Sequence, residues 1–149
     1  MRLRAAVLPA WGAAAVLLTG CLSLSFHRAV SDEEYVLLGE LREYYDQVAD
    51  AFLGANADAL AQLYDSAIGR PMTRDQVLAW ARDFFRKHGP AHFKVDKLDV
   101  ERVGHVSAVV VLTYHVDTRD GRGSFHGVER DELVKHGRRW SIAAWEKLQ

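Results

Sequence analysis

The chain has 149 residues, of which 26% are charged, and its 19 basic and 20 acidic residues give a formal net charge of −1 at pH 7. This length suits a single domain, and the balanced charge excludes the strongly basic surface that is typical of nucleic-acid-binding domains. Cys21 is the only cysteine, so the chain cannot form an internal disulfide.

The first 20 residues have the pattern of a signal peptide. Two arginines lie within residues 1–4, and residues 5–18 are almost entirely apolar. This run is shorter than the roughly 20 residues that a membrane-spanning helix needs, so it predicts a cleaved signal instead of a permanent anchor. The run Leu-Thr-Gly-Cys that ends at Cys21 resembles the lipobox of bacterial lipoproteins. An ordinary secretory signal that ends at a cysteine is the open alternative.

The resemblance implies that the signal is cleaved before Cys21 and that this cysteine is then acylated, which anchors the protein to a membrane. We therefore divide the chain into a signal peptide (residues 1–20), a lipidated N-terminus and tether (21–30) and one folded domain (31–149). Leu22 follows the cysteine where inner-membrane lipoproteins of many Gram-negative bacteria carry aspartate, so the outer membrane is favoured if the cell has one. Ten residues of extended chain reach at most about 36 Å, which keeps the domain close to its membrane.

Three helices are predicted before residue 90. A capping box, S-x-x-E, begins at Ser31, and Gly54 ends the helix that follows it. Asn56 is suited to cap a short second helix. A second capping box, T-x-x-Q, begins at Thr73, and its helix stops at Gly89. The first helix carries apolar residues at spacings of three or four, which place them on one face: Leu37, Leu41, Tyr44, Val48 and Phe52.

Beyond Pro90 the apolar pattern has the period of two that is typical of strands. A first strand changes phase near Asp96, which predicts an irregularity there. A second strand covers residues 105–116, and Asp120-Gly121 predicts a two-residue hairpin turn of type I′. A third strand continues to residue 135, and a fourth covers residues 139–146 after a turn at Gly137.

Helices followed by an antiparallel meander predict an α+β fold, with the N-terminal helices packed on one face of a curved sheet. This order, together with the segments ADALAQLYD, FF and GRRWSIAAWEKL, resembles the nuclear transport factor 2-like superfamily, which includes SnoaL-like polyketide cyclases and ketosteroid isomerases. The resemblance implies a cone-shaped domain whose mouth binds a small apolar molecule. A further implication is that many members are dimers.

The predicted turn fixes which residues face each other, because paired residue numbers then sum to 241. His115 faces His126, with Asp117 and Ser124 on the same face. A catalytic zinc normally has three protein ligands, so two histidines are not a metal site, and we expect none. The chain also lacks a Gly-rich phosphate loop, G-x-S-x-G and H-E-x-x-H, and we expect no cofactor.

The opposite face of the same strands carries the best catalytic candidates. Leu112 faces Glu129 and Val110 faces Asp131, so two carboxyl groups project into an apolar pocket, where burial raises their pKa values toward those of a general acid or base. A bulge within residues 128–132 that turns both acids to solvent is the open alternative. Ketosteroid isomerases use a first-helix tyrosine, which by resemblance makes Tyr45 (or Tyr44) a third candidate. The expected ligand-binding residues are Tyr114, Phe125, Leu112, Trp80 and Phe84.

Two functions follow from these observations. The leading hypothesis is a lipid-anchored envelope protein that is not a catalyst and binds a small apolar molecule or a protein partner. The alternative is a cofactor-free isomerase, dehydratase or cyclase that uses Glu129 or Asp131 as its general base. A homodimer through the outer sheet face would use Val109, Val111 and Val128.

Overall fold

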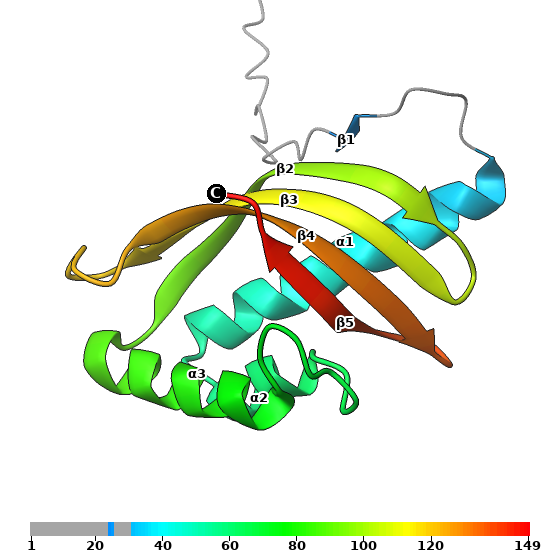
Figure 1. The fold of residues 1–149 in the computed structure, drawn as a ribbon. Helices are drawn as coiled ribbons and strands as arrows, with labels where there is room; N and C mark the ends of the chain where they lie inside the picture. The colour runs from blue at the N-terminus through cyan, green and yellow to red at the C-terminus, as the bar shows by residue number, and fades with distance from the viewer. Residues whose placement is uncertain (1–23, 26–30) are drawn as a thin grey trace, which may run out of the picture.

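The computed structural model describes residues 24–25 and 31–149 (Figure 1). The signal peptide and Cys21 lie outside these residues, as does most of the tether, so their processing and acylation stay predictions. Within the described residues, none of the helices is both long and apolar enough to span a membrane.

The three helices begin and end where the capping signals predict. Helix α1 (Asp32–Leu53) starts after the Ser31 capping box, in which both reciprocal hydrogen bonds are present, and Gly54 is its C-cap. The Asn56 side chain caps the short α2 (Ala57–Gln62). Helix α3 (Arg74–His88) follows the second capping box and ends at Gly89, whose φ of +69° is a conformation that favours glycine.

Four long antiparallel strands follow the helices in chain order: β2 (Ala91–Val103), β3 (Ser107–Thr118), β4 (Phe125–His136) and β5 (Arg139–Lys147). The two-residue β1 (Leu24–Ser25) pairs with β2 in parallel at the edge of the sheet. The sheet curves over α1, while α2 and α3 lie toward one end of α1 (Figure 1). The predicted α+β architecture is therefore confirmed.

The β3–β4 pairing is the predicted one, because Leu112 faces Glu129 and Val110 faces Asp131. The predicted irregularity in β2 is also present, as a register shift between Val95 and Lys97. The predicted type I′ turn is wrong. Such a turn needs positive φ at both central residues, and Asp120 does not have it.

A six-residue loop, residues 119–124, joins β3 to β4 in place of that turn. The side chain of Thr118 holds it closed: its hydroxyl donates to Asp120 Oδ1 at 2.9 Å and accepts from the backbone N–H of Gly123 at 3.1 Å. The hydroxyl of Ser124 accepts from the backbone N–H of Thr118 at 2.9 Å. These bonds keep the predicted register although the turn is longer than predicted.

The last hairpin contains a bulge that the sequence analysis did not predict. Leu133 pairs with Ile142, but Glu132 pairs with Ala144, so Ala143 is the extra residue. The bulge reverses the alternation of β5 and places Trp145 opposite Asp131. Because the extra residue lies on β5, Asp131 and the other inward residues of β4 keep their direction.

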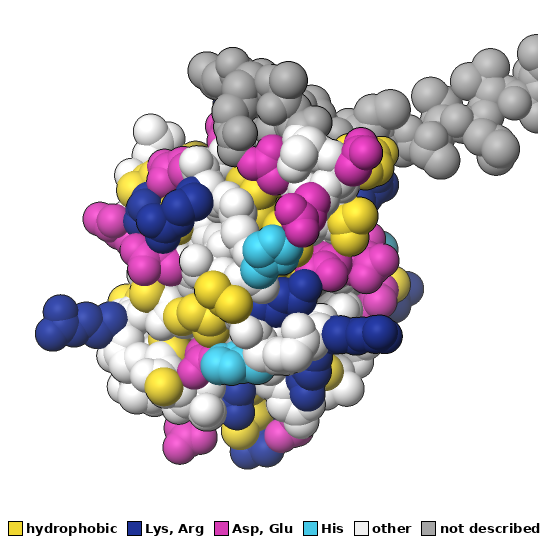
Figure 2. All heavy atoms as spheres, turned by 90° about the vertical axis from the view of Figure 1, so that its right-hand side faces the viewer, with side chains coloured by type: hydrophobic (Ala, Val, Ile, Leu, Met, Phe, Trp, Pro, Cys, Tyr) yellow, Lys and Arg dark blue, Asp and Glu magenta, His cyan; other side chains and the backbone are white. Residues whose placement is uncertain are grey.

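The outer face of the sheet bears on the predicted homodimer. Val109 is buried, with 3% of its surface exposed, whereas Val111 and Val128 are half-buried. Figure 2 views the molecule from the right-hand side of Figure 1, at right angles to that view, and on that side hydrophobic side chains lie scattered among acidic and basic ones. The homodimer stays a prediction, and Val109 is its least accessible member.

Candidate functional site

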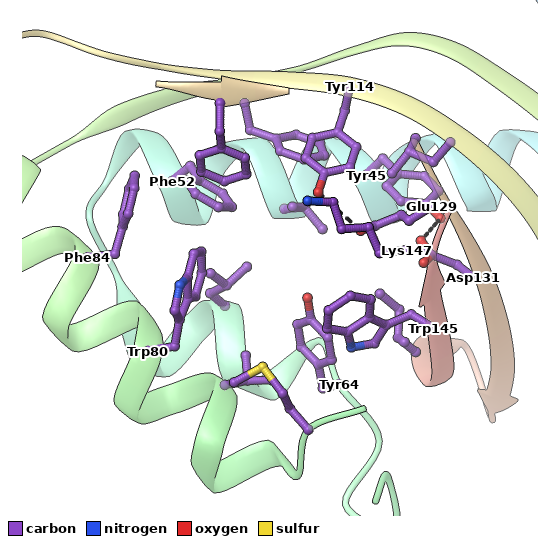
Figure 3. A pocket seen from close by; sticks show the side chains of 18 of the residues that line it. Tyr45, Phe52, Tyr64, Trp80, Phe84, Tyr114, Glu129, Asp131, Trp145 and Lys147 are labelled. Carbon is purple, nitrogen blue, oxygen red and sulfur yellow. Dashed lines mark hydrogen bonds between the residues drawn. The ribbon is translucent and has the colours of Figure 1, made fainter. Parts of the chain in front are cut away.

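The concave face of the sheet and the three helices line an open cavity of about 480 Å³ (Figure 3). Its walls are mostly aromatic, and two carboxyl groups lie at one end. All eight residues that the sequence analysis proposed for catalysis or ligand binding line it: Tyr45, Trp80, Phe84, Leu112, Tyr114, Phe125, Glu129 and Asp131. The alternative in which a bulge turns both acids to solvent does not apply to this structure.

Asp131 is held at the cavity wall by helix α1. Its side chain is fully buried, and the Tyr45 hydroxyl donates a 2.7 Å hydrogen bond to Oδ2. No hydrogen-bond partner for Oδ1 is found among the described residues. Tyr44 takes a different role, because its hydroxyl donates to the backbone oxygen of Leu63 within the core. Of the two candidate tyrosines, only Tyr45 therefore reaches an acid.

Glu129 is paired with a second tyrosine. The Tyr114 hydroxyl donates to Oε2 of Glu129 at 3.1 Å. Tyr114 faces Gly127 across the strands, and a Cβ at residue 127 would lie 3.0 Å from the tyrosine hydroxyl oxygen. The absence of a side chain at Gly127 thus makes room for Tyr114 to extend along β4 to Glu129.

Burial shifts the acid–base properties of both carboxyl groups. Burial raises the pKa of Glu129 to about 7, although the Tyr114 hydrogen bond and the positive charge of Lys147 act in the other direction. Burial also raises the pKa of Asp131 well above its usual range, and the neighbouring Glu129 carboxylate adds to this shift. Close buried acids resist simultaneous ionisation, so this end of the cavity retains protons near neutral pH.

The other end of the cavity is a continuous set of aromatic rings. Trp80 stacks on Phe84 with ring centroids 5.3 Å apart, and Phe84 meets Phe125 edge-to-face at 6.0 Å. Phe125 in turn meets Tyr114 edge-to-face at 6.2 Å. These contacts join the ring end to Glu129 through Tyr114, so a bound molecule would contact aromatic surface along its length and carboxyl groups at one end.

Comparison with known proteins identifies the fold. No protein-family profile and no curated protein sequence matches the chain. Among solved structures, Bd1075 from Bdellovibrio bacteriovorus superposes with a TM-score of 0.66 at 12% identity, over 79% of this chain and 44% of the other. This chain therefore spans less than half the length of that protein.

Two further solved structures match this chain over nearly their whole length. An NTF2-like protein of unknown function from Shewanella oneidensis has a TM-score of 0.61 and 17% identity, over 74% of this chain and 97% of its own. The chain has an NTF2-like fold. A candidate dehydratase of the NTF2-like family from Streptomyces avermitilis has a TM-score of 0.58 and 11% identity, over 76% of this chain and 96% of the other.

The NTF2-like cavity contains residues that the sequence analysis did not assign to it. Tyr64, which follows α2, points its hydroxyl into the cavity (Figure 3). Trp145 and Lys147 line the cavity from β5, opposite Asp131 and Glu129 respectively. The alternation of apolar and polar residues in β5 did not predict that Trp145 and Lys147 line the cavity, because the bulge at Ala143 reverses which residues face inward.

The outer face of the NTF2-like sheet brings His115 and His126 opposite each other, as predicted. The His115 ring contacts two acids. Its Nδ1 lies 2.8 Å from Asp96 Oδ2, and its Nε2 lies 3.3 Å from Asp117 Oδ2. Within residues 24–25 and 31–149, no group of three or more histidine, cysteine or acidic side chains is arranged to hold a metal ion.

Proposed function

We propose that this protein is a lipid-anchored component of the cell envelope whose NTF2-like domain binds a small, largely apolar molecule. The cavity carries this proposal: it has a volume of about 480 Å³, ring-lined walls and a few polar groups at one end. Ligand sites in proteins typically have 300–1,000 Å³ and combine apolar walls with few polar groups that fix orientation. The lipobox at Cys21 supports the location, and the outer membrane is favoured in a Gram-negative cell.

Native mass spectrometry of the protein purified from its host envelope tests the binding proposal. We expect a bound small molecule in the native spectrum that is absent from the denatured spectrum. Trp80→Ala removes one cavity wall and should reduce the bound fraction. Tyr35→Ala is the matched control, because Tyr35 is an aromatic residue of α1 that is 75% exposed and does not line the cavity. If Trp80→Ala and Tyr35→Ala retain the small molecule equally, this cavity is not its binding site.

A second function is supported by the chemistry of Glu129. A carboxyl group with a pKa of about 7 in an aromatic cavity is suited to remove and return a proton at neutral pH. Tyr64, whose hydroxyl points into the cavity (Figure 3), is placed to donate a hydrogen bond to a developing oxyanion. These groups suit a cofactor-free isomerase, dehydratase or cyclase, and one fold neighbour is a candidate dehydratase.

Proton exchange at carbon distinguishes catalysis from binding alone. Enolisable aryl ketones are incubated with the protein in D₂O, and deuterium uptake next to the carbonyl is measured by mass spectrometry. In the catalytic case, uptake depends on the protein and Glu129→Gln abolishes it. In the binding-only case, the ketones bind without uptake above the buffer rate.

A further inference from the structure

The acidic end of the cavity indicates the chemical class of the ligand, an inference that rests on the proposed binding function. Among the described residues, Lys147 is the one lysine or arginine that lines the cavity with these acids, and it is exposed near the end of β5. His88 also lines the cavity, and His126, which is exposed and faces His115 on the outer side of the sheet, borders it. Within the cavity, Glu129 and Asp131 therefore have little positive charge near them.

Asp131 also presents an acceptor that the described residues leave unused. Tyr45 donates to Oδ2, whereas Oδ1 is buried and has no partner there. A buried polar atom without a hydrogen-bond partner destabilises the folded protein, so such atoms are rare unless a bound group completes them. A cationic donor carried by the ligand would take the place of the acid's proton and satisfy Oδ1 at the cavity wall. Glu129 accepts its hydrogen bond from Tyr114 at Oε2.

The rings beside the acids favour a cation. Tyr45, Tyr64 and Tyr114 line the cavity together with the indole of Trp145, and Figure 3 shows these side chains around the carboxyl end. The face of an aromatic ring attracts an organic cation, and an ammonium group supplies three hydrogen-bond donors but no acceptor. A carboxylate ligand would have no cation to pair with at this end apart from Lys147, and each acid that ionises would repel it.

We infer that the ligand of this cavity is an aryl or alkyl amine whose ammonium group lies between Glu129 and Asp131, while its apolar part packs against the aromatic end. Each acid then has a cationic partner in place of a retained proton. Binding therefore releases protons, and affinity rises with pH across the neutral range until the amine itself loses its charge. The groups that face the ammonium are the two acids, Tyr45 from α1, Tyr64, Tyr114 from β3 and Lys147 from β5.

Lys147 gives the inference a second, independent test. It faces Glu129 across the strands, and its positive charge lowers the pKa of that acid. The lysine and a ligand ammonium therefore compete for the same carboxylate. Lys147→Met removes the competitor and should strengthen amine binding, whereas a binding site for anions would be weakened by this change.

Three naphthalene probes of matched size distinguish the ligand classes: 2-(1-naphthyl)ethylamine, 2-(1-naphthyl)ethanol and 1-naphthaleneacetate. Each is titrated calorimetrically into the processed protein, purified from its host envelope and held in lipid nanodiscs at pH 7.5, with empty nanodiscs as the blank. We expect the amine to bind on the order of tenfold more tightly than the alcohol, which corresponds to about 1.4 kcal/mol, and the acetate to bind most weakly. Equal or tighter binding of the alcohol or the acetate would overturn the inference but leave the binding function standing.

Two variants and a control tie the preference to the acids. Glu129→Gln and Asp131→Asn should each remove the preference for amine over alcohol. Glu132→Gln should retain it, because Glu132 lies on the same strand, is exposed and pairs with Arg130 instead. If neither acid variant folds, two results still test the inference. These are the preference of the wild type for the amine over the alcohol and the effect of Lys147→Met on amine binding. Failure of all three probes to bind would overturn the proposed function and the inference with it.

Discussion

The Tyr45 hydroxyl donates a 2.7 Å hydrogen bond to Asp131 Oδ2 and so connects α1 to β4 across 86 positions of the sequence. Both residues are buried. The bond lowers the pKa of Asp131 against the larger opposing effect of burial. This contact fixes the side chain of one cavity acid, and the other acid is fixed in the same way by Tyr114.

Tyr45→Phe should lower the free energy of unfolding by about 1–2 kcal/mol, because it leaves both oxygens of a buried carboxyl group without a donor. Thermal or urea unfolding measures this loss. Tyr35→Phe is the control: Tyr35 is on the same helix and 75% exposed, so its variant should unfold like the wild type. Equal stability of the two variants would contradict the role given to the Tyr45 bond.

The stability of the domain should fall as the pH rises from about 4.5 to about 7. Burial raises the pKa of Glu129 to about 7 in the folded protein, from 4.5 in the unfolded chain. Between these values the folded protein retains a proton that the unfolded chain releases, so a rising pH favours unfolding. The contribution of Glu129 levels off above pH 7 and amounts to about 3 kcal/mol.

Glu129→Gln should reduce this dependence to the part that Asp131 contributes, since glutamine does not titrate. Urea unfolding at a series of pH values between 4 and 8 provides the comparison, with Glu132→Gln as the control on the exposed side of β4. A wild-type stability that does not change between pH 5 and 7 would show that Glu129 titrates as an exposed acid does.

Gly127→Ala should separate Tyr114 from Glu129, because the new Cβ would lie 3.0 Å from the tyrosine hydroxyl oxygen. Loss of this hydrogen bond raises the pKa of Glu129 further, since the bond lowers it in the wild type. Titration of the Glu129 carboxyl carbon by NMR measures the shift. Gly69→Ala is the matched control, because a Cβ there meets nothing within 4 Å. An unchanged Glu129 pKa in Gly127→Ala would contradict the proposed contact.

Cys21→Ser should abolish lipid attachment if the lipobox is used. Cells fed a radiolabelled fatty acid should label the wild type but not the variant, and the unprocessed variant should migrate as a larger protein. Equal labelling of both would contradict the acylation prediction. Release of unlabelled wild-type protein into the soluble periplasm would favour the ordinary secretory signal.

The sequence predicted the helices and the β3–β4 face because their signals are local. Capping boxes at Ser31 and Thr73 mark helix starts whatever the rest of the fold does. The pairing of Leu112 with Glu129 followed from a residue count across the hairpin. That count succeeded although the turn type was wrong, because the last β3–β4 pair, Val116 with Phe125, lies symmetrically about Asp120 and Gly121, as the predicted turn requires.

Other parts of the site depend on features without a local signal. A bulge at Ala143 decides that Trp145 faces Asp131, and no glycine or proline marks it in the sequence. Tyr64 enters the cavity from the connection after α2, and a helical spacing that turns its side chain inward does not distinguish a core position from a cavity wall. The burial that sets the pKa values of both acids arises only when α1 packs beneath the sheet.

The most direct test of whether the cavity binds a small molecule is native mass spectrometry. The processed protein is purified for this measurement from the envelope of its host. We expect a non-covalent ligand in the native spectrum whose bound fraction falls in Trp80→Ala but not in Tyr35→Ala. A bare protein that also binds none of the three naphthalene probes would contradict the claim, and the search would then turn to protein partners near the membrane.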